Sequence, residues 1–181
     1  MPELSRFLPE DQDLLVGLFY RVGLWMSHID DTDEDETSET AEHEQLLRVL
    51  AKISKTESAA VLIREMADEA VRQKQSWARW ERRSDSLLED VGRGLKLLKG
   101  QGVEAEIVSF RKALMFIGTS VARAYREDQD MERTGQGGLS WLSEKASEML
   151  TAVADREAYR DLSISPAEDT ALSELLEALK Q

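Results

Sequence analysis

The chain has 181 residues, of which 41% are hydrophobic, with a formal net charge of −13 and no cysteine. This length and hydrophobic content suffice for one sizeable core, so we expect a single all-helical domain over residues 1–181. The charge argues against nucleic acid as a partner, because binding to phosphate backbones depends on clustered Lys and Arg. The lack of cysteine excludes disulfides, thiolate nucleophiles and Cys-ligated zinc.

The N-terminal residues have neither the basic region nor the apolar region of a secretory signal, and no stretch approaches the length of a membrane span. We therefore expect a cytoplasmic protein without membrane insertion. Only three prolines occur, two of them within the first nine residues, so little interrupts helix formation along most of the chain. The composition thus favours an all-α fold.

The first half of the chain carries apolar residues at the three- and four-residue spacing of amphipathic helices. The spacing predicts a helix over about 9–28, a second that ends near Ser54, and a long third helix over about 58–83. Arg79, Arg82 and Arg83 are interpreted as a solvated face of this third helix. The supporting apolar residues are Leu15, Phe19, Val22, Met26, Leu46, Leu47, Val49, Leu50, Ile53, Leu62, Met66, Ala70, Trp77 and Trp80.

A fourth helix is predicted to begin near Ser84 or Ser86, because Ser86 and Glu89 have the spacing of a capping box. Its apolar residues are Leu87, Leu88, Val91, Leu95 and Leu98, and Gly100 and Gly102 are expected to end it.

Three further helices are predicted in the second half of the chain. The clearest covers about 104–125, a shorter one covers about 142–153, and the last covers about 166–180. The last helix has a strong N-terminal signature, with a serine, a proline and a glutamate at residues 165, 166 and 168.

The two halves of the chain resemble each other. An offset of 95 positions places Leu15 on Phe110, Phe19 on Leu114, Val22 on Ile117, Gly23 on Gly118 and Met26 on Val121, and one more residue of offset places Leu46 on Leu142. This predicts a compact bundle of about seven helices with a helix-loop-helix duplication, whose pseudo-repeats cover about 9–54 and 104–153. The alternative is that any two amphipathic helices align on their apolar residues.

Residues 30–44 hold nine acidic residues without apolar periodicity, so we expect a loop here, with helix resuming near Thr40. Within it Asp31, Asp33, Asp35, Glu39 and Glu42 stand at positions 1, 3, 5, 9 and 12 of a calcium-loop template. Position 6 holds glutamate where that template places glycine. The pattern predicts a divalent-cation site for calcium or magnesium, and the alternatives are a loop that binds a basic protein surface or one that only confers solubility.

The sequence does not indicate an enzyme. No Gly-x-Ser-x-Gly elbow is present, and no Gly-Lys-Ser/Thr follows the glycines at 135–138. The two histidines, His28 and His43, lack the Glu-x-x-His spacing of di-iron bundles. The four tryptophans are interpreted as core or edge packing rather than as a cofactor pocket.

These features together resemble the tellurite-resistance TerB-like family, over about residues 14–153. The residues that carry the resemblance are the stretch from Ile29 to Asp31 with Glu42, and then Val121, Ala122 and Ala124, the glycines at 135–138, and Ser140 with Glu144. The resemblance implies a compact helical domain with an internal duplication and a stress-response or scaffold role. It also implies a metal-binding acidic loop and no catalysis. The alternative is a helical interaction or regulatory domain without a metal site.

Overall fold

A computed structural model describes residues 2–29, 36–127 and 165–181, and the side chains of 36–42 and 123–127 lie outside that description. Every regular element in these residues is helical, as the sequence predicts. The elements are η1 (Glu3–Arg6), α1 (Pro9–Ser27), α2 (Glu36–Ile53), α3 (Val61–Arg72), η2 (Lys74–Ser76), α4 (Trp77–Glu81), η3 (Ser84–Ser86), α5 (Leu87–Gln101), α6 (Glu104–Glu127) and α9 (Pro166–Lys180).

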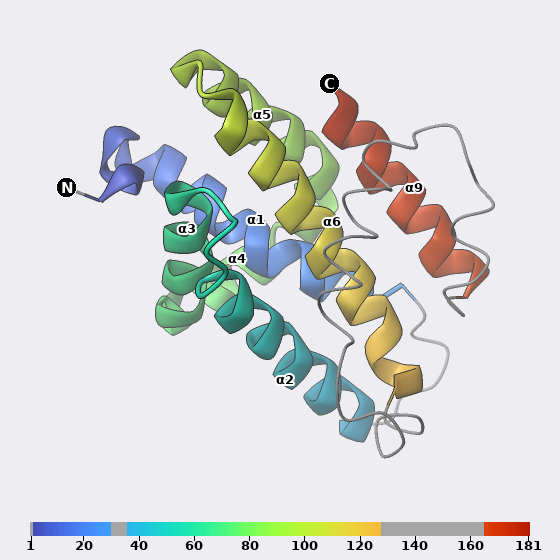
Figure 1. Cartoon of the computed structure of the whole chain (residues 1–181). Coiled ribbons are helices and arrows are strands. Elements are labelled where there is room, and N and C mark those ends of the chain that lie inside the picture. The colour runs from blue at the N-terminus through green and yellow to red at the C-terminus, as the bar shows by residue number, and fades with distance from the viewer. Residues whose placement is uncertain (1, 30–35, 128–164) are drawn as a thin grey trace.

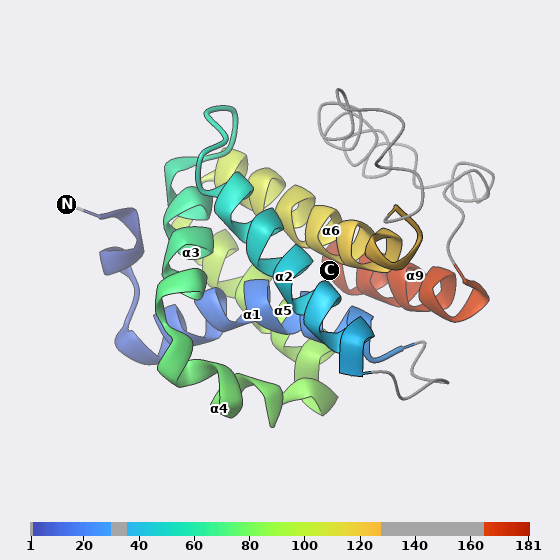
Figure 2. The same ribbon diagram turned by 90° about the horizontal axis from the view of Figure 1, so that it is seen from below.

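Helix α1 lies at the centre of the bundle, where it packs against α2, α3, α4, α5 and α6. Helix α6 runs beside it and also contacts α2, α5 and α9 (Figure 1). Both views place α3 and α4 at one end of the molecule and α9 at the other (Figure 2). The first helix of the chain is therefore the one around which most of the others are arranged.

The apolar stripes predicted from the sequence meet in one continuous hydrophobic cluster, to which every α-helix of the described residues contributes. Helix α1 alone buries eleven residues, which is more than a single helical stripe supplies, because it is covered on several sides. Fully buried members of the cluster include Leu15, Phe19, Val22, Leu50, Leu62, Met66, Val91, Leu98, Phe110, Leu114, Ile117 and Leu175.

Two glycines of α1 allow its neighbours to approach closely. A Cβ atom at Gly17 would lie 2.9 Å from the indole nitrogen of Trp80, and one at Gly23 would lie 2.3 Å from a Leu46 methyl group. Both distances are too short for a non-bonded contact, so a residue with a Cβ atom does not fit at either position without a shift of its neighbour. Helix α1 therefore packs closely against α4 at Gly17 and against α2 at Gly23.

The single helix predicted over 58–83 is wrong, because the structure divides this stretch into α3, η2 and α4. Gln73 has a non-helical backbone (φ −83°, ψ 48°), and the chain turns there. The Trp77 indole donates a hydrogen bond to the Ala70 carbonyl (2.9 Å), which satisfies a group that the end of α3 leaves without a helical partner. The turn brings Trp80 back against α1.

The start of α5 also differs from the prediction. Ser86 precedes the helix, but its side chain accepts no capping hydrogen bond from the backbone. Its hydroxyl bonds instead with the Asp90 carboxylate (3.0 Å), so tertiary contacts replace the expected capping box. The predicted stop is confirmed, since Gly102 follows the helix in the left-handed conformation (φ 73°), whereas Gly100 lies inside the last turn.

The duplication remains a prediction, because the second loop and the helix predicted over 142–153 lie outside the described residues. The paired positions on α1 and α6, such as Phe19 and Leu114, are both fully buried. The paired glycines face different helices, however. Gly23 lies against α2, whereas Gly118 lies 3.2 Å, measured from an added Cβ, from Leu172 of α9.

The capping box of α9 is confirmed. The Ser165 hydroxyl accepts from the Glu168 backbone N–H, and the Glu168 carboxylate accepts from the Ser165 N–H (2.7 Å). We expect Ser165→Ala to lower the free energy of unfolding by about 1 kcal/mol, because it leaves a helix N–H without its partner. Urea denaturation measures this. Ser173→Ala, within the same helix, is the control and should change stability by less than about 0.5 kcal/mol.

Candidate functional site

The predicted cation ligands fall mainly outside the part of the chain that the structure describes. Asp31, Asp33 and Asp35 lie in the undescribed stretch 30–35, and Glu39 and Glu42 lie on α2 among residues whose side chains are not described. Within the described residues no three His, Asp or Glu side chains are grouped so that they could hold a metal ion. The five-ligand site therefore stays a prediction.

The acidic segment is less of a loop than the sequence suggests. Helix α2 begins at Glu36, four residues before the expected start near Thr40. Glu36 occupies the position at which the calcium-loop template needs a sharp turn, and a residue in the first turn of a helix does not supply one. An acidic residue is favourable at this place for another reason, since the N-terminus of a helix carries partial positive charge.

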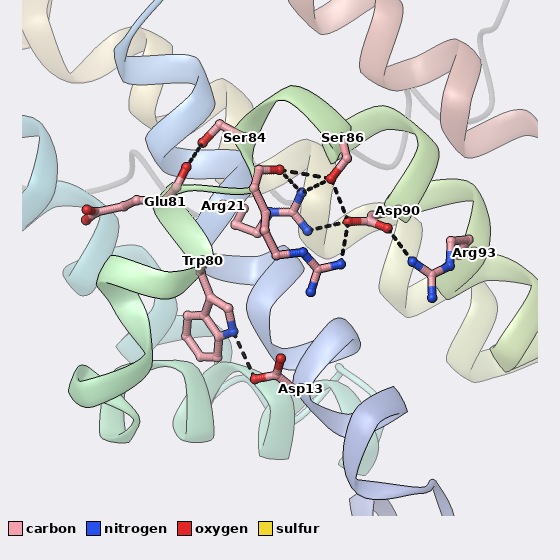
Figure 3. Close-up of polar contacts among 9 residues, drawn as sticks. Asp13, Arg21, Trp80, Glu81, Ser84, Ser86, Asp90 and Arg93 are labelled. Atoms are coloured by element: carbon pink, nitrogen blue, oxygen red, sulfur yellow. Dashed lines mark hydrogen bonds and ion pairs between the residues drawn. The ribbon is translucent and has the colours of Figure 1, made fainter.

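The most strongly connected polar cluster in the described residues surrounds Asp90 at the start of α5 (Figure 3). One carboxylate oxygen accepts from Arg21 (2.8 Å), Arg83 (3.0 Å) and Ser86 (3.0 Å), and the other accepts from Arg93 (2.8 Å). Arg21 also donates to the Arg83 carbonyl and to the Ser86 hydroxyl. The cluster joins α1, the turn after α4, and α5.

Burial separates the inner from the outer members of this cluster. The side chains of Arg21 and Asp90 are 1% and 3% exposed, whereas those of Arg83 and Arg93 are 38% and 56% exposed. Burial by itself raises the pKa of Asp90, but the hydrogen bonds from Arg21 and Ser86 and the charges of Arg21 and Arg83 together lower it below its usual value. Asp90 is therefore ionised at neutral pH.

The arginines of residues 79–83 are not the uniform solvated face that the sequence suggests. Arg79 pairs with Asp13 of α1, and Arg83 pairs with Asp90. Arg82 is exposed, as predicted. The difference arises because the turn at Gln73 brings this segment against α1 and α5.

An aromatic cluster lies beside the ion network, where α1, α2 and α4 meet. Tyr20 stacks on Trp77 at 5.1 Å between ring centroids, and His43 packs edge-on against both rings. The Tyr20 hydroxyl donates to Glu81 (3.0 Å). Burial of Tyr20, and then its hydrogen bond to Glu81 and the charge of Glu81, raise its pKa well above 10.0.

Because the folded-state pKa of Tyr20 lies above the unfolded value, its neutral form stabilises the fold below pH 10, and this contribution is lost as the pH rises above 10. We expect Tyr20→Phe to leave the amplitude of tyrosine ionisation near pH 10 unchanged, since Tyr20 does not titrate there in the folded protein. Ultraviolet absorption measures that amplitude. A loss of one third, for one of the chain's three tyrosines, would contradict the result.

Comparisons of the chain with known proteins found no matching family model, no matching curated protein and no matching solved structure. Among the helices of the described residues, none is both long and apolar enough to cross a membrane.

Proposed function

We propose that this protein is a non-enzymatic helical interaction module whose acidic segment, residues 30–44, binds a basic protein surface. The observation that carries the proposal is the start of α2 at Glu36. It places Glu36, Glu39 and Glu42 on one helix at three-residue spacing, so successive carboxylates recur about one turn apart. A helix with carboxylates at this spacing suits a partner with a matching row of Lys or Arg.

The charge of the segment supports the same proposal. Nine of its fifteen residues are Asp or Glu and none is Lys or Arg. Uncompensated carboxylates repel one another at this density, and a basic partner relieves the repulsion. Electrostatic complementarity of this kind mainly raises the association rate and the specificity of a complex, which suits a regulatory or scaffold role of the TerB-like type.

The ion network supports a binding role over a catalytic one. Its most perturbed members, Asp90 and Arg21, are bonded to each other and are almost completely buried. The hydrogen bonds and charges around Asp90 keep it ionised far below neutral pH. A general acid or base works best with a pKa near the operating pH, which Asp90 does not have.

A divalent cation is the second candidate ligand of the acidic segment. The spacing of Asp31, Asp33, Asp35, Glu39 and Glu42 favours it, because hard cations such as calcium and magnesium take several carboxylate oxygens. A cation would reduce the same repulsion that a basic surface relieves. In the proposed cation complex, α2 would supply the last two ligands from its first two turns.

Heteronuclear NMR titrations of the whole protein separate these candidates. A lysine-rich helical peptide should cause saturable shifts in residues 30–44, and Asp31→Asn/Asp33→Asn/Asp35→Asn should weaken its binding by about tenfold or more. Glu10→Gln/Glu57→Gln/Glu174→Gln removes the same charge from exposed positions elsewhere and should change it little. Shifts that saturate with calcium or magnesium alone below millimolar concentration favour the second candidate. No saturation with either ligand would overturn both.

A further inference from the structure

Helix α9 presents a row of leucines to the rest of the bundle. Leu172, Leu175, Leu176 and Leu179 are all buried, and they stand at the i, i+3, i+4 and i+7 positions by which amphipathic helices bind grooves on other proteins. The helix packs on α5 and α6 (Figure 1). The surface of α5 and α6 that α9 covers, called here the docking surface, therefore already holds a ligand of this kind.

The docking surface is shaped for two of these leucines. A Cβ atom at Gly118 of α6 would lie 3.2 Å from a Leu172 methyl group and 3.4 Å from a Leu175 methyl group. Glycine inside a helix costs about 1 kcal/mol relative to alanine, and here it leaves room for both side chains. The methyl group of Met26 lies 3.6 Å from the same added atom and forms the floor of the contact. The surface thus fits a helix with leucines about one turn apart.

Few polar contacts hold α9 in place. Within the parts of the chain that the structure describes, one hydrogen bond joins it to another helix, from the Lys99 ammonium to the Gln181 carbonyl just after its end. Helix α5, by contrast, is tied to α1 by the buried pair of Arg21 and Asp90. The capping box of α9 joins residues that belong to α9 itself, so it moves with the helix. Undocking of α9 therefore breaks no ion pair between the described helices.

Opposite charges add to the apolar contact. After its first turn α5 carries Arg93, Lys96 and Lys99 and no acidic residue, and Arg93 is paired with Asp90. The stretch 104–118 of α6 is balanced, with two acidic and two basic residues. Helix α9 itself carries one basic and four acidic residues, which are Lys180, Glu168, Asp169, Glu174 and Glu177. The docking surface therefore favours an acidic helix.

We infer that the docking surface on α5 and α6 binds an acidic amphipathic helix of a partner protein, with leucines at the spacing of α9, and that α9 fills it until such a helix displaces it. This goes beyond the proposed function, because it concerns another surface and an acidic partner instead of a basic one. Because α9 belongs to the same chain, it competes as an intramolecular ligand. Helices that match the surface poorly are therefore excluded.

The first experiment measures whether α9 opens on its own. The chain has no cysteine, so a single introduced thiol reports exposure at one place. Leu175→Cys on α9 and Leu114→Cys on α6 each replace a fully buried leucine. In the whole native protein the thiol at position 175 should react with a maleimide about tenfold faster or more, because a terminal helix opens locally whereas α6 is exposed only by global unfolding. Urea denaturation of both variants corrects for any difference in global stability.

The second experiment supplies a helix in trans. A synthetic peptide of residues 165–181 should raise the reactivity of the Leu175→Cys variant saturably, because it occupies the docking surface and keeps α9 out. Backbone NMR of the native protein should place the peptide-induced shifts on α5 and α6. The same peptide with Leu172→Asp/Leu175→Asp is the control and should have neither effect. A peptide with Glu174→Gln/Glu177→Gln should bind about threefold more weakly or worse, since it lacks two of the acidic charges.

Equal reactivity of the two thiols after the stability correction, or no saturable effect of the peptide, would overturn the inference. Unchanged affinity of the peptide that lacks the two charges would contradict the preference for an acidic helix. A dimer that forms as the protein concentration rises, observed by sedimentation and without peptide binding, would assign the docking surface to α9 of a second copy and overturn the assignment to a partner.

Discussion

Asp90→Ala is expected to lower the free energy of unfolding by about 3–5 kcal/mol, because it leaves a buried charge without its partner. The side chain of Arg21 is 1% exposed, and Asp90 is the carboxylate that compensates it. Removing one member of such a pair costs more than the pair itself contributes, since the remaining charge stays out of water. Urea denaturation at neutral pH measures the loss.

Two controls separate this effect from a general loss of surface charge. Arg93→Ala removes an exposed partner of the same carboxylate and should cost no more than about 1 kcal/mol. Arg21→Met/Asp90→Leu removes both buried charges and should be much more stable than Asp90→Ala, because apolar side chains of similar volume replace the pair. A loss below about 1 kcal/mol for Asp90→Ala would show that Arg21 reaches solvent.

The same carboxylate sets part of the acid stability. Its folded-state pKa lies below the unfolded value of 3.8, so its contribution is fully present above pH 3.8 and is lost as the pH falls through the folded-state pKa. Asp90→Asn should therefore be less stable than the native sequence above pH 3.8. The difference in the free energy of unfolding between the two, measured by urea denaturation, should shrink as the pH falls below 3.8.

Trp80→Ala is expected to lower the free energy of unfolding by about 3–5 kcal/mol, because it empties a large buried volume between α4 and α1. Trp80 is 1% exposed, lies against the backbone of α1 at Gly17, and donates to the Asp13 carboxylate (3.0 Å). It also packs against Tyr20 at 5.9 Å between ring centroids. Thermal or urea unfolding measures the change.

Trp80→Phe keeps most of the apolar contact and loses the hydrogen bond, so it should cost clearly less than the alanine variant. Trp77→Ala is the matched control three residues earlier, where the indole is only partly buried and the loss should be smaller. Equal losses in the free energy of unfolding for Trp77→Ala and Trp80→Ala would show that the contact of Trp80 with Gly17 adds no stability beyond that of a partly buried tryptophan.

Local sequence patterns predicted those helices whose ends are set by local chemistry. The box of Ser165 and Glu168 and the glycine after α5 act within a few residues, so their effects are visible in the sequence. The turn at Gln73 could not be predicted in this way, because no proline or glycine marks it. It depends on the contact of Trp77 with α3 and on the contact of Trp80 with α1.

The ion network was missed for a similar reason. Arg21 and Asp90 are 69 positions apart, and nothing in the sequence pairs them. One indication was present, since Arg21 interrupts an apolar run from Leu14 to Trp25, and a charge at such a place needs a partner. The early start of α2 was obscured because nine carboxylates in one segment suggest a loop, although acidic residues also favour a helix N-terminus.

The separation of Arg21 from Asp90 also has a consequence for the order of events during synthesis. Helix α1 is translated before α2, α3, α4, α5 and α6, so its buried apolar residues lack these covering helices at that stage. At ribosomal rates the 69 residues to Asp90 take on the order of ten seconds to add. During this interval Arg21 keeps a charge on the apolar helix, as gatekeeper residues do in aggregation-prone segments. The same charge becomes part of a buried ion pair once α5 packs against α1.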